Sequence, residues 1–72
     1  MQSANPLIMR MKDVQRTVSL SRSSIYNKVN ERSRYFDVTF PKPVKLGSSA
    51  VGWISVEIYQ WIAQKSDGRP KD

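Results

Sequence analysis

The sequence predicts a small, mainly α-helical domain with one β-hairpin, and three observations support this prediction. Two short segments with helical spacing of their apolar residues follow one another in the first half of the chain. Two short alternating segments separated by a Gly-Ser turn come next, and a longer amphipathic segment follows them. The chain has 72 residues. A domain of about 60 residues buries only about 60% of the surface that its unfolded chain exposes, so the core must be small.

The composition excludes several classes of functional site. Lys and Arg total 12 against 6 Asp and Glu, which gives a net charge of +6, and the chain has no Cys and no His. A disulfide, a zinc-thiolate site and a thiol nucleophile are therefore impossible, and the commonest general base is missing. Asp13 and Glu31 lie among basic residues, and no Gly-rich phosphate loop is present. We expect neither an enzyme nor a cofactor or metal site.

The excess of positive charge indicates a polyanionic partner. Residues 10–34 hold seven basic residues against two acidic ones, which suits nucleic acid or an anionic surface. The longest aliphatic run, Leu7-Ile8-Met9, is far shorter than a membrane span or the core of a signal peptide. We therefore expect a cytoplasmic protein without a membrane segment.

One folded domain is expected between two tails. Residues 1–6 are polar and end in Pro, and residues 65–72 hold Gly, Pro and five charges without apolar periodicity. These patterns predict a flexible N-terminal tail over 1–6, a domain over 7–64 and a flexible basic C-terminal tail over 65–72.

Two short helices are predicted at the start of the domain. Met11, Val14 and Val18 have the spacing of one helical face, which predicts a helix over 12–18. Ser21 is a good N-cap for a second helix, because its hydroxyl can accept hydrogen bonds from the free amides of the next turn. This second helix is expected to end at residue 29 or 30.

The second helix is predicted to have one apolar face and one hydrogen-bonding face. Ile25 and Val29 are four residues apart and share a side, which is expected to face the core. Ser23, Asn27 and Asn30 project from the opposite side, with Tyr26 beside them.

The second half of the domain predicts a hairpin and a third helix. Residues 30–43 are irregular, with Phe40 as an aromatic anchor. Alternating apolar residues over 44–46 and 51–53 predict two short strands joined by a tight turn. Ser55 is expected to cap the third helix, whose core-facing stripe contains Ile54, Ile58, Trp61 and Ile62.

Two short helices joined by a short turn form the helix-turn-helix arrangement, and the hairpin lies where such a domain carries a wing. The second helix is narrow enough to enter the major groove of double-stranded DNA, and its N-terminal amides favour a phosphate. We therefore expect a DNA partner. The candidate DNA-binding residues lie on the second helix and on the hairpin: Ser21, Arg22, Ser23, Ser24, Tyr26, Asn27, Lys28, Lys45, Ser48 and Ser49.

The candidates have different expected roles. Arg22 suits guanine O6 and N7 or a phosphate, Asn27 suits adenine N6 and N7, and Ser23 approaches the bases. Ser24, Tyr26 and Lys28 are expected to contact phosphates. The hairpin residues Lys45, Ser48 and Ser49 are expected to lie along the adjacent backbone or the minor groove. Structural alternatives stay open. Ser21 and Ser24 can each act in the helix cap alone, Asn27 can simply be solvated on an exposed helix face, and Lys45 can simply keep a strand edge soluble.

Trp53 and Trp61 allow two interpretations. Exposed aromatic rings can stack with the bases of a single strand. The spacing of these two residues places them on core-facing positions instead, where large apolar side chains dominate the packing of a small domain. We therefore expect both in the core, with Met9 and Met11 at its edge.

Taken together, the segments RMKDV (10–14), LSRSSIY (20–26), FPKPVKLG (40–47), VGW (51–53) and WI (61–62) resemble the AlpA family of prophage regulatory proteins. The resemblance implies a winged helix-turn-helix of the MerR-like and excisionase-like type. It also implies bacterial DNA binding, in a family whose members act as transcriptional activators or repressors and sometimes as excision factors for integrated elements.

The chain departs from the family pattern in two places. The family usually has Gly in the turn where this chain has Ser19, and a non-Gly residue at a left-handed position costs on the order of 1 kcal/mol. The segment 27–39 is longer than in the compact members. The resemblance therefore implies no position for Arg32, Arg34 or Tyr35.

The preferred function is a sequence-specific DNA-binding transcriptional regulator of a prophage or integrated element. The alternative is an excision factor that bends DNA beside an integrase, which would bind closely spaced repeats cooperatively. A third hypothesis is an adaptor whose basic surface docks an acidic protein or a membrane. One domain of this size contacts few base pairs, so tight binding is expected to need a dimer or adjacent copies.

Overall fold

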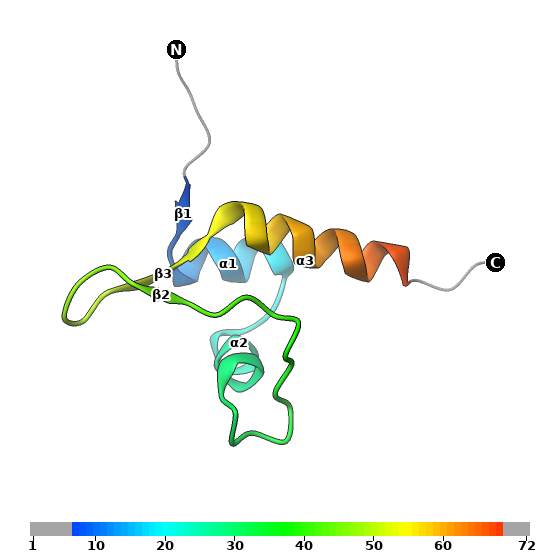
Figure 1. Cartoon of the computed structure of the whole chain (residues 1–72), viewed down its shortest axis with the longest axis horizontal. Coiled ribbons are helices and arrows are strands. Elements are labelled where there is room, and N and C mark those ends of the chain that lie inside the picture. Colours follow the sequence, from blue (N-terminus) through cyan, green and yellow to red (C-terminus); the bar gives the residue numbers. More distant parts are fainter. Residues whose placement is uncertain (1–6, 69–72) are drawn as a thin grey trace, which may run out of the picture.

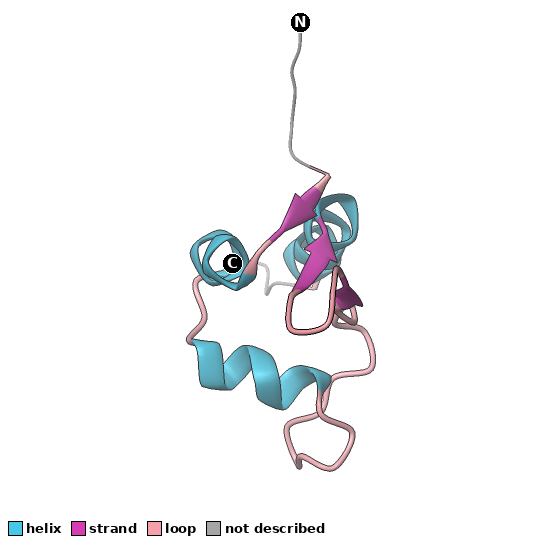
Figure 2. Ribbon diagram, turned by 90° about the vertical axis from the view of Figure 1, so that its left-hand side faces the viewer, coloured by secondary structure: helices cyan, strands magenta, loops and turns pink. Residues whose placement is uncertain are grey.

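The computed structural model describes residues 7–68, and they contain three helices and three short strands (Figure 1). In chain order the elements are β1 (Ile8–Met9), α1 (Met11–Val18), α2 (Arg22–Val29), β2 (Val44–Lys45), β3 (Val51–Ile54) and α3 (Ser55–Asp67). The predicted winged helix-turn-helix, mainly α-helical with a small hairpin, is confirmed. In Figure 2, α1 and α3 are viewed nearly end-on, and α2 runs across beneath them.

The strands form a small antiparallel sheet in the order β1-β3-β2. Lys45 of β2 is opposite Val51 of β3, so these two strands make the predicted hairpin. The backbone N–H of Leu46 donates to the carbonyl of Ala50 at 2.8 Å, so the first and last residues of the loop between the two strands are hydrogen-bonded to each other. The hairpin loop therefore projects from the side of the domain as a wing (Figure 1).

The strand β1 is not predicted by the sequence pattern, because two residues are too few to show an alternation. It pairs with β3, and Met9 lies opposite Trp53. Met9 is therefore a member of the core, not of its edge, with 5% of its surface exposed. The carbonyl of Leu7, the residue before β1, also accepts a hydrogen bond from the backbone N–H of Ser55 at 2.8 Å, at the start of α3.

The close approach of β1 explains the Gly in the VGW segment. A Cβ atom at Gly52 would lie 2.6 Å from Cγ2 of Ile8 and 3.1 Å from the carbonyl oxygen of Met9. The second of these atoms belongs to the backbone and cannot move aside without disturbing the sheet. A side chain at this position would therefore separate β1 from β3.

The core lies between the helices and the sheet, and the apolar faces expected from the sequence are confirmed. Val14 of α1, Ile25 of α2 and Ile58 of α3 are fully buried. Both tryptophans belong to the core, as predicted. The Phe40 ring meets the Trp61 ring edge to face, with 4.9 Å between centroids, so the aromatic anchor is confirmed as well.

Both ends of α3 differ from the predictions. Its N-cap is Ile54 and not Ser55, and no side chain caps the helix. Ser55 is instead the first residue of the helix, where it is buried and its N–H donates to the carbonyl of Leu7. The helix continues to Asp67, so residues 65–67 belong to it and not to the predicted tail. The other residues of the predicted tails, apart from Gly68, lie outside the described part of the chain.

Within residues 7–68, no helix is long and apolar enough to cross a membrane. The same residues contain no group of three or more carboxylates placed to hold a metal ion.

The turn between α1 and α2 depends on a left-handed residue. Ser19 is the C-cap of α1, with φ 59° and ψ 40°. Among residues 7–68 it is the one non-Gly residue with positive φ. The departure from the family's Gly therefore falls at a position where a Cβ is strained.

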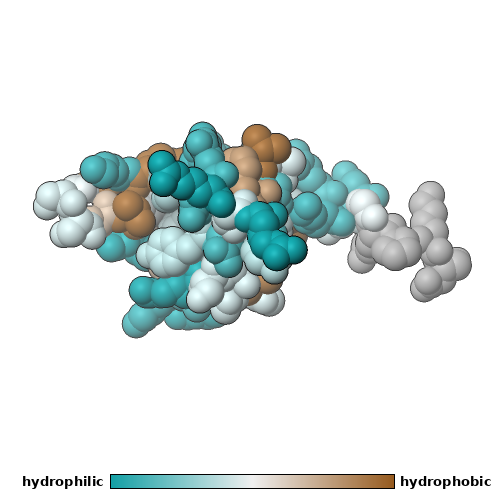
Figure 3. Space-filling model, turned by 90° about the horizontal axis from the view of Figure 1, so that it is seen from below, coloured by the Kyte–Doolittle hydropathy of each residue, from teal (hydrophilic) through white to brown (hydrophobic). Residues whose placement is uncertain are grey.

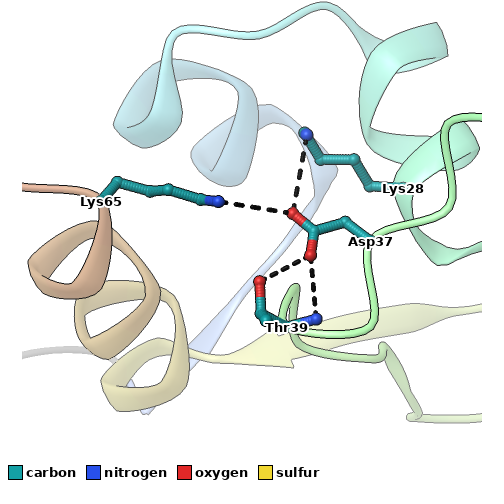
Figure 4. Close-up of polar contacts among 4 residues, drawn as sticks. All are labelled: Lys28, Asp37, Thr39 and Lys65. Atoms are coloured by element: carbon teal, nitrogen blue, oxygen red, sulfur yellow. Dashed lines mark hydrogen bonds and ion pairs between the residues drawn. The ribbon is translucent and has the colours of Figure 1, made fainter. Parts of the chain in front are cut away.

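A carboxylate in the loop after α2 joins three parts of the fold (Figure 4). Oδ1 of Asp37 accepts hydrogen bonds from Oγ1 of Thr39 at 2.6 Å and from its backbone N–H at 2.9 Å. Oδ2 lies 3.8 Å from the Nζ atoms of Lys28 on α2 and of Lys65 on α3. The Thr39 hydroxyl is the main cause that lowers the pKa of Asp37 below its ordinary value. Desolvation opposes the shift, and the Thr39 amide and both lysines reinforce it.

Ser19→Gly is expected to raise the free energy of unfolding by about 0.5–1 kcal/mol, because Gly adopts the left-handed conformation without a steric cost but loses more backbone entropy on folding. A thermal melt followed by circular dichroism should show Tm rising by about 4 °C. Ser23→Gly is the matched control, since Gly in an exposed helical position should lose about 0.5 kcal/mol. A lower Tm for Ser19→Gly would contradict the strain at this turn.

Asp37→Asn is expected to destabilise the fold by about 1 kcal/mol at neutral pH, because Asn keeps an acceptor but loses the charge. The folded pKa is lowered, so the contribution of the carboxylate is fully present above the unfolded pKa of about 4 and is lost as the pH falls through the folded pKa. Urea unfolding at several pH values measures this difference.

The wild-type and Asp37→Asn proteins should therefore converge in stability under acid conditions. Glu31→Gln serves as the control, because this exposed carboxylate makes a single surface ion pair with Lys42 at 3.6 Å and should contribute little. A constant difference between wild type and Asp37→Asn at every pH would rule out this ionic role.

Candidate nucleic-acid interface

The helix α2 turns its apolar side to the core and its polar side outward. Ile25 is fully buried and Val29 packs against the core cluster. Ser23 is exposed and Asn27 is half-buried on the other side of the helix. The predicted register of this helix is confirmed, and the polar groups of these two residues face away from the core.

The start of α2 is fixed by a serine pair. Oγ of Ser21 accepts a hydrogen bond from the backbone N–H of Ser24 at 3.1 Å, so the predicted N-cap is confirmed. The Ser21 hydroxyl also donates to Oγ of Ser24 at 3.1 Å. These two hydroxyls therefore stabilise the end of the helix, where the backbone amides and the helix dipole favour an anion.

A basic groove lies beside α2, between this helix, the start of α1 and the hairpin. This wing-side groove has a volume of about 510 Å³. Its lining residues are Arg10, Met11, Lys12, Asp13, Arg16, Arg22, Tyr26, Ser49 and Val51. Four basic side chains thus converge with one acid, and three candidates from the sequence, Arg22, Tyr26 and Ser49, are brought together here.

Arg10 connects two walls of the wing-side groove. Its Nε donates to the carbonyl oxygen of Val51 at 3.1 Å, at the start of β3 directly after the hairpin loop. Its backbone N–H donates to Oδ2 of Asp13 at 3.1 Å, in the first turn of α1. One guanidinium group therefore fixes the hairpin against α1, and the acid of the groove is already hydrogen-bonded.

The basic residues of α1 are absent from the candidates drawn from the sequence. A signal for them exists, because Lys12 and Arg16 lie four residues apart and share one helical face. That spacing does not tell which partner the face meets. Only the packing of α1 beside the hairpin directs these side chains toward Arg22.

Lys28 does not line the wing-side groove. Its Nζ lies 3.8 Å from Oδ2 of Asp37 and 5.6 Å from the centroid of the Trp61 ring. The side chain is therefore directed toward α3 and the loop after α2. Lys45 and Ser48 are exposed on the hairpin but are not among the residues that line the wing-side groove.

A second hollow lies on the opposite flank of α2. This loop-side hollow has a volume of about 260 Å³ and is lined by Leu20, Ser24, Asn27, Lys28 and Tyr35. The hairpin and the loop after α2 thus lie on different sides of the helix (Figure 1). The face of the domain seen from below is mostly hydrophilic (Figure 3). The tip of the hairpin projects at the left of this view and has intermediate hydropathy.

Comparison with known proteins agrees with this architecture. A family model described as "Prophage CP4-57 regulatory protein (AlpA)" matches residues 7–66. The chain is 40% identical over 58 residues to the "DNA-binding transcriptional activator AlpA" of Escherichia coli (strain K12), covering 81% of this chain and 83% of that protein.

The chain is also 32% identical over 63 residues to "Uncharacterized protein ORF88" of Enterobacteria phage P4, covering 88% of this chain and 65% of that protein. No solved structure matches the chain significantly. The match to the family model spans β1 to α3, and the relative from Escherichia coli is similar over most of both lengths. The chain belongs to the AlpA family of prophage regulatory proteins.

Proposed function

We propose that this protein is a sequence-specific DNA-binding transcriptional regulator that places α2 in the major groove and the hairpin along the adjacent backbone. The observation that carries the proposal is the position of α2, whose polar side faces outward beside a groove lined by Arg10, Lys12, Arg16 and Arg22. The name of the relative from Escherichia coli, a DNA-binding transcriptional activator, supports the same activity. The cytoplasm is the compartment that this role requires.

The proposed contacts follow the positions of the side chains. Arg22 lies in the first turn of α2, where a guanidinium group can reach guanine O6 and N7 or a phosphate. Ser23 and Asn27 face outward and approach base edges. The backbone contacts are assigned to Tyr26, Lys45, Ser48, Ser49 and the basic residues of α1. Ser21 and Ser24 support these contacts by holding the first turn of the helix, and Lys28 is left out because it is paired with Asp37.

The regulatory role is preferred to the alternatives. A transcriptional activator among the relatives favours regulation over an architectural role in excision, and no observation supports an integrase partner. An adaptor for acidic proteins or membranes would not need Ser23 and Asn27 on the outward side of a capped helix. A dimer or adjacent copies remain our expectation for tight binding, since α2 presents few side chains to bases.

The wild-type protein is expected to select a defined motif from a random duplex library and to bind it in a salt-dependent manner. If Arg10, Lys12, Arg16, Arg22 and Lys45 each neutralise one phosphate, they contribute a slope of about −4.5 to a plot of log K against log salt. Fluorescence anisotropy at several salt concentrations measures this slope. A flat profile, or equal affinity for selected and scrambled duplexes, would exclude the proposed function.

Arg22→Ala is expected to weaken binding to the selected duplex by about 1–3 kcal/mol and to relax the preference at one base pair. Lys45→Ala is the matched control on the hairpin and should weaken all sequences alike, because a phosphate contact carries no base preference. Binding to a panel of single-base variants of the selected site separates the two effects. Unchanged affinity for Arg22→Ala would show that the assigned register of α2 on DNA is wrong.

A further inference from the structure

The loop after α2 presents positive charge that no acid of the fold neutralises. We call residues 31–36 the arginine loop. Arg32 and Arg34 are exposed, and neither takes part in an ion pair within the described residues 7–68. The acids on either side of them are already engaged, because Glu31 is paired with Lys42 at 3.6 Å and Asp37 is held by two lysines.

The arginine loop is held close to α2 by short hydrogen bonds. The side-chain oxygen of Asn30, the C-cap of α2, accepts from the backbone N–H of Arg32 at 3.0 Å. The hydroxyl of Ser33 accepts from the N–H of Tyr35 at 3.0 Å. The N–H of Asp37 donates to the carbonyl of Lys28 at 3.0 Å and returns the chain to the helix. The charges of the loop therefore have a defined position beside α2.

The geometry of α2 places the arginine loop and the hairpin on different flanks. At about 100° per residue, the helix directs Arg22 and Tyr26 to one side of the outward residues Ser23 and Asn27, and Ser24 to the other side. The two hollows agree with this division, since Tyr26 lines the wing-side groove and Ser24 lines the loop-side hollow.

Tyr35 brings the arginine loop to the loop-side hollow. It lines this hollow together with Ser24 and Asn27, and 62% of its surface is exposed. The guanidinium carbon of Arg34 lies 5.5 Å from the centroid of the Tyr35 ring, so the two side chains form one polar and aromatic surface. A phenol hydroxyl and a guanidinium group are both donors to phosphate oxygen.

We propose that the arginine loop binds the phosphate backbone of the second DNA strand, so that both strands bordering the major groove are held. This inference rests on the proposed function. The major groove is about 12 Å wide and an α-helix with its side chains measures about 10–12 Å across, so a helix in the groove has one sugar-phosphate strand on each flank. The wing-side groove faces one strand, and Arg32, Arg34 and Tyr35 face the other.

The test uses the full chain with the double substitution Arg32→Ala and Arg34→Ala, on the duplex selected by the wild type. Loss of two phosphate contacts should reduce the magnitude of the salt slope by about 1.8 and weaken binding about 30-fold at 0.15 M salt, the counterion-release contribution of two phosphates relative to 1 M. The base preference should not change. Circular dichroism checks that the exposed substitutions leave the fold intact.

Two comparisons make the test specific. The charge-conserving pair Arg32→Lys and Arg34→Lys should keep the slope near the wild-type value, since slope counts charges and not geometry. Phosphate ethylation interference on both strands should then show that the alanine pair and Lys45→Ala lose sensitivity at phosphates on different strands.

The inference is overturned if the alanine pair keeps the wild-type slope, if the lysine pair loses as much as the alanine pair, or if both regions map to the same phosphates. In each of these cases the wild type still selects and binds its duplex, so the proposed function stands. If the wild type selects no duplex, the proposed function and this inference fail together.

Discussion

The burial of Trp53 at the centre of the sheet is the interaction on which the rest of the structure depends. Trp53 lies on the middle strand β3, has no exposed surface and is opposite Met9 of β1. Its indole Nε1 also donates a hydrogen bond to the carbonyl of Pro41 at 3.1 Å, which holds the end of the loop after α2. One side chain therefore positions the hairpin, the N-terminal strand and the long loop relative to one core.

The charges of the domain are arranged so that the α2 side stays positive. Asp13 and Asp37 accept internal hydrogen bonds, and Glu31 is paired with a lysine. Glu57 and Asp67 lie on α3, which Figure 1 places away from α2. Within residues 7–68, Arg22 and the basic residues of α1 and the arginine loop are therefore left without an ionic partner.

Much of this fold follows from local sequence, and the parts that do not are set by long-range pairing. The apolar spacing of α1, the Ser21 cap, the register of Ile25 on α2 and the core positions of both tryptophans are visible in the pattern of residues. The strand β1 is not, because its residues become a strand only by pairing with β3 more than forty positions later.

The site shows the same division. The outward residues of α2 are predicted by helical periodicity, but Lys12 and Arg16 line the wing-side groove only because the hairpin packs beside α1. The inward direction of Lys28 depends on a carboxylate nine residues later in an irregular loop. Periodicity describes a face of one helix, and it does not tell which neighbours border that face.

The hydrogen bond from Arg10 to the carbonyl of Val51 in the hairpin has a consequence for the DNA sequence that the proposed function would recognise. Because this bond holds the hairpin against α1, the distance between the side chains proposed to contact bases and those proposed to contact the backbone is set by the fold. Operators for this regulator would then share a constant separation between their conserved bases and the neighbouring helical turn. An inserted base pair between the two would therefore break one set of contacts.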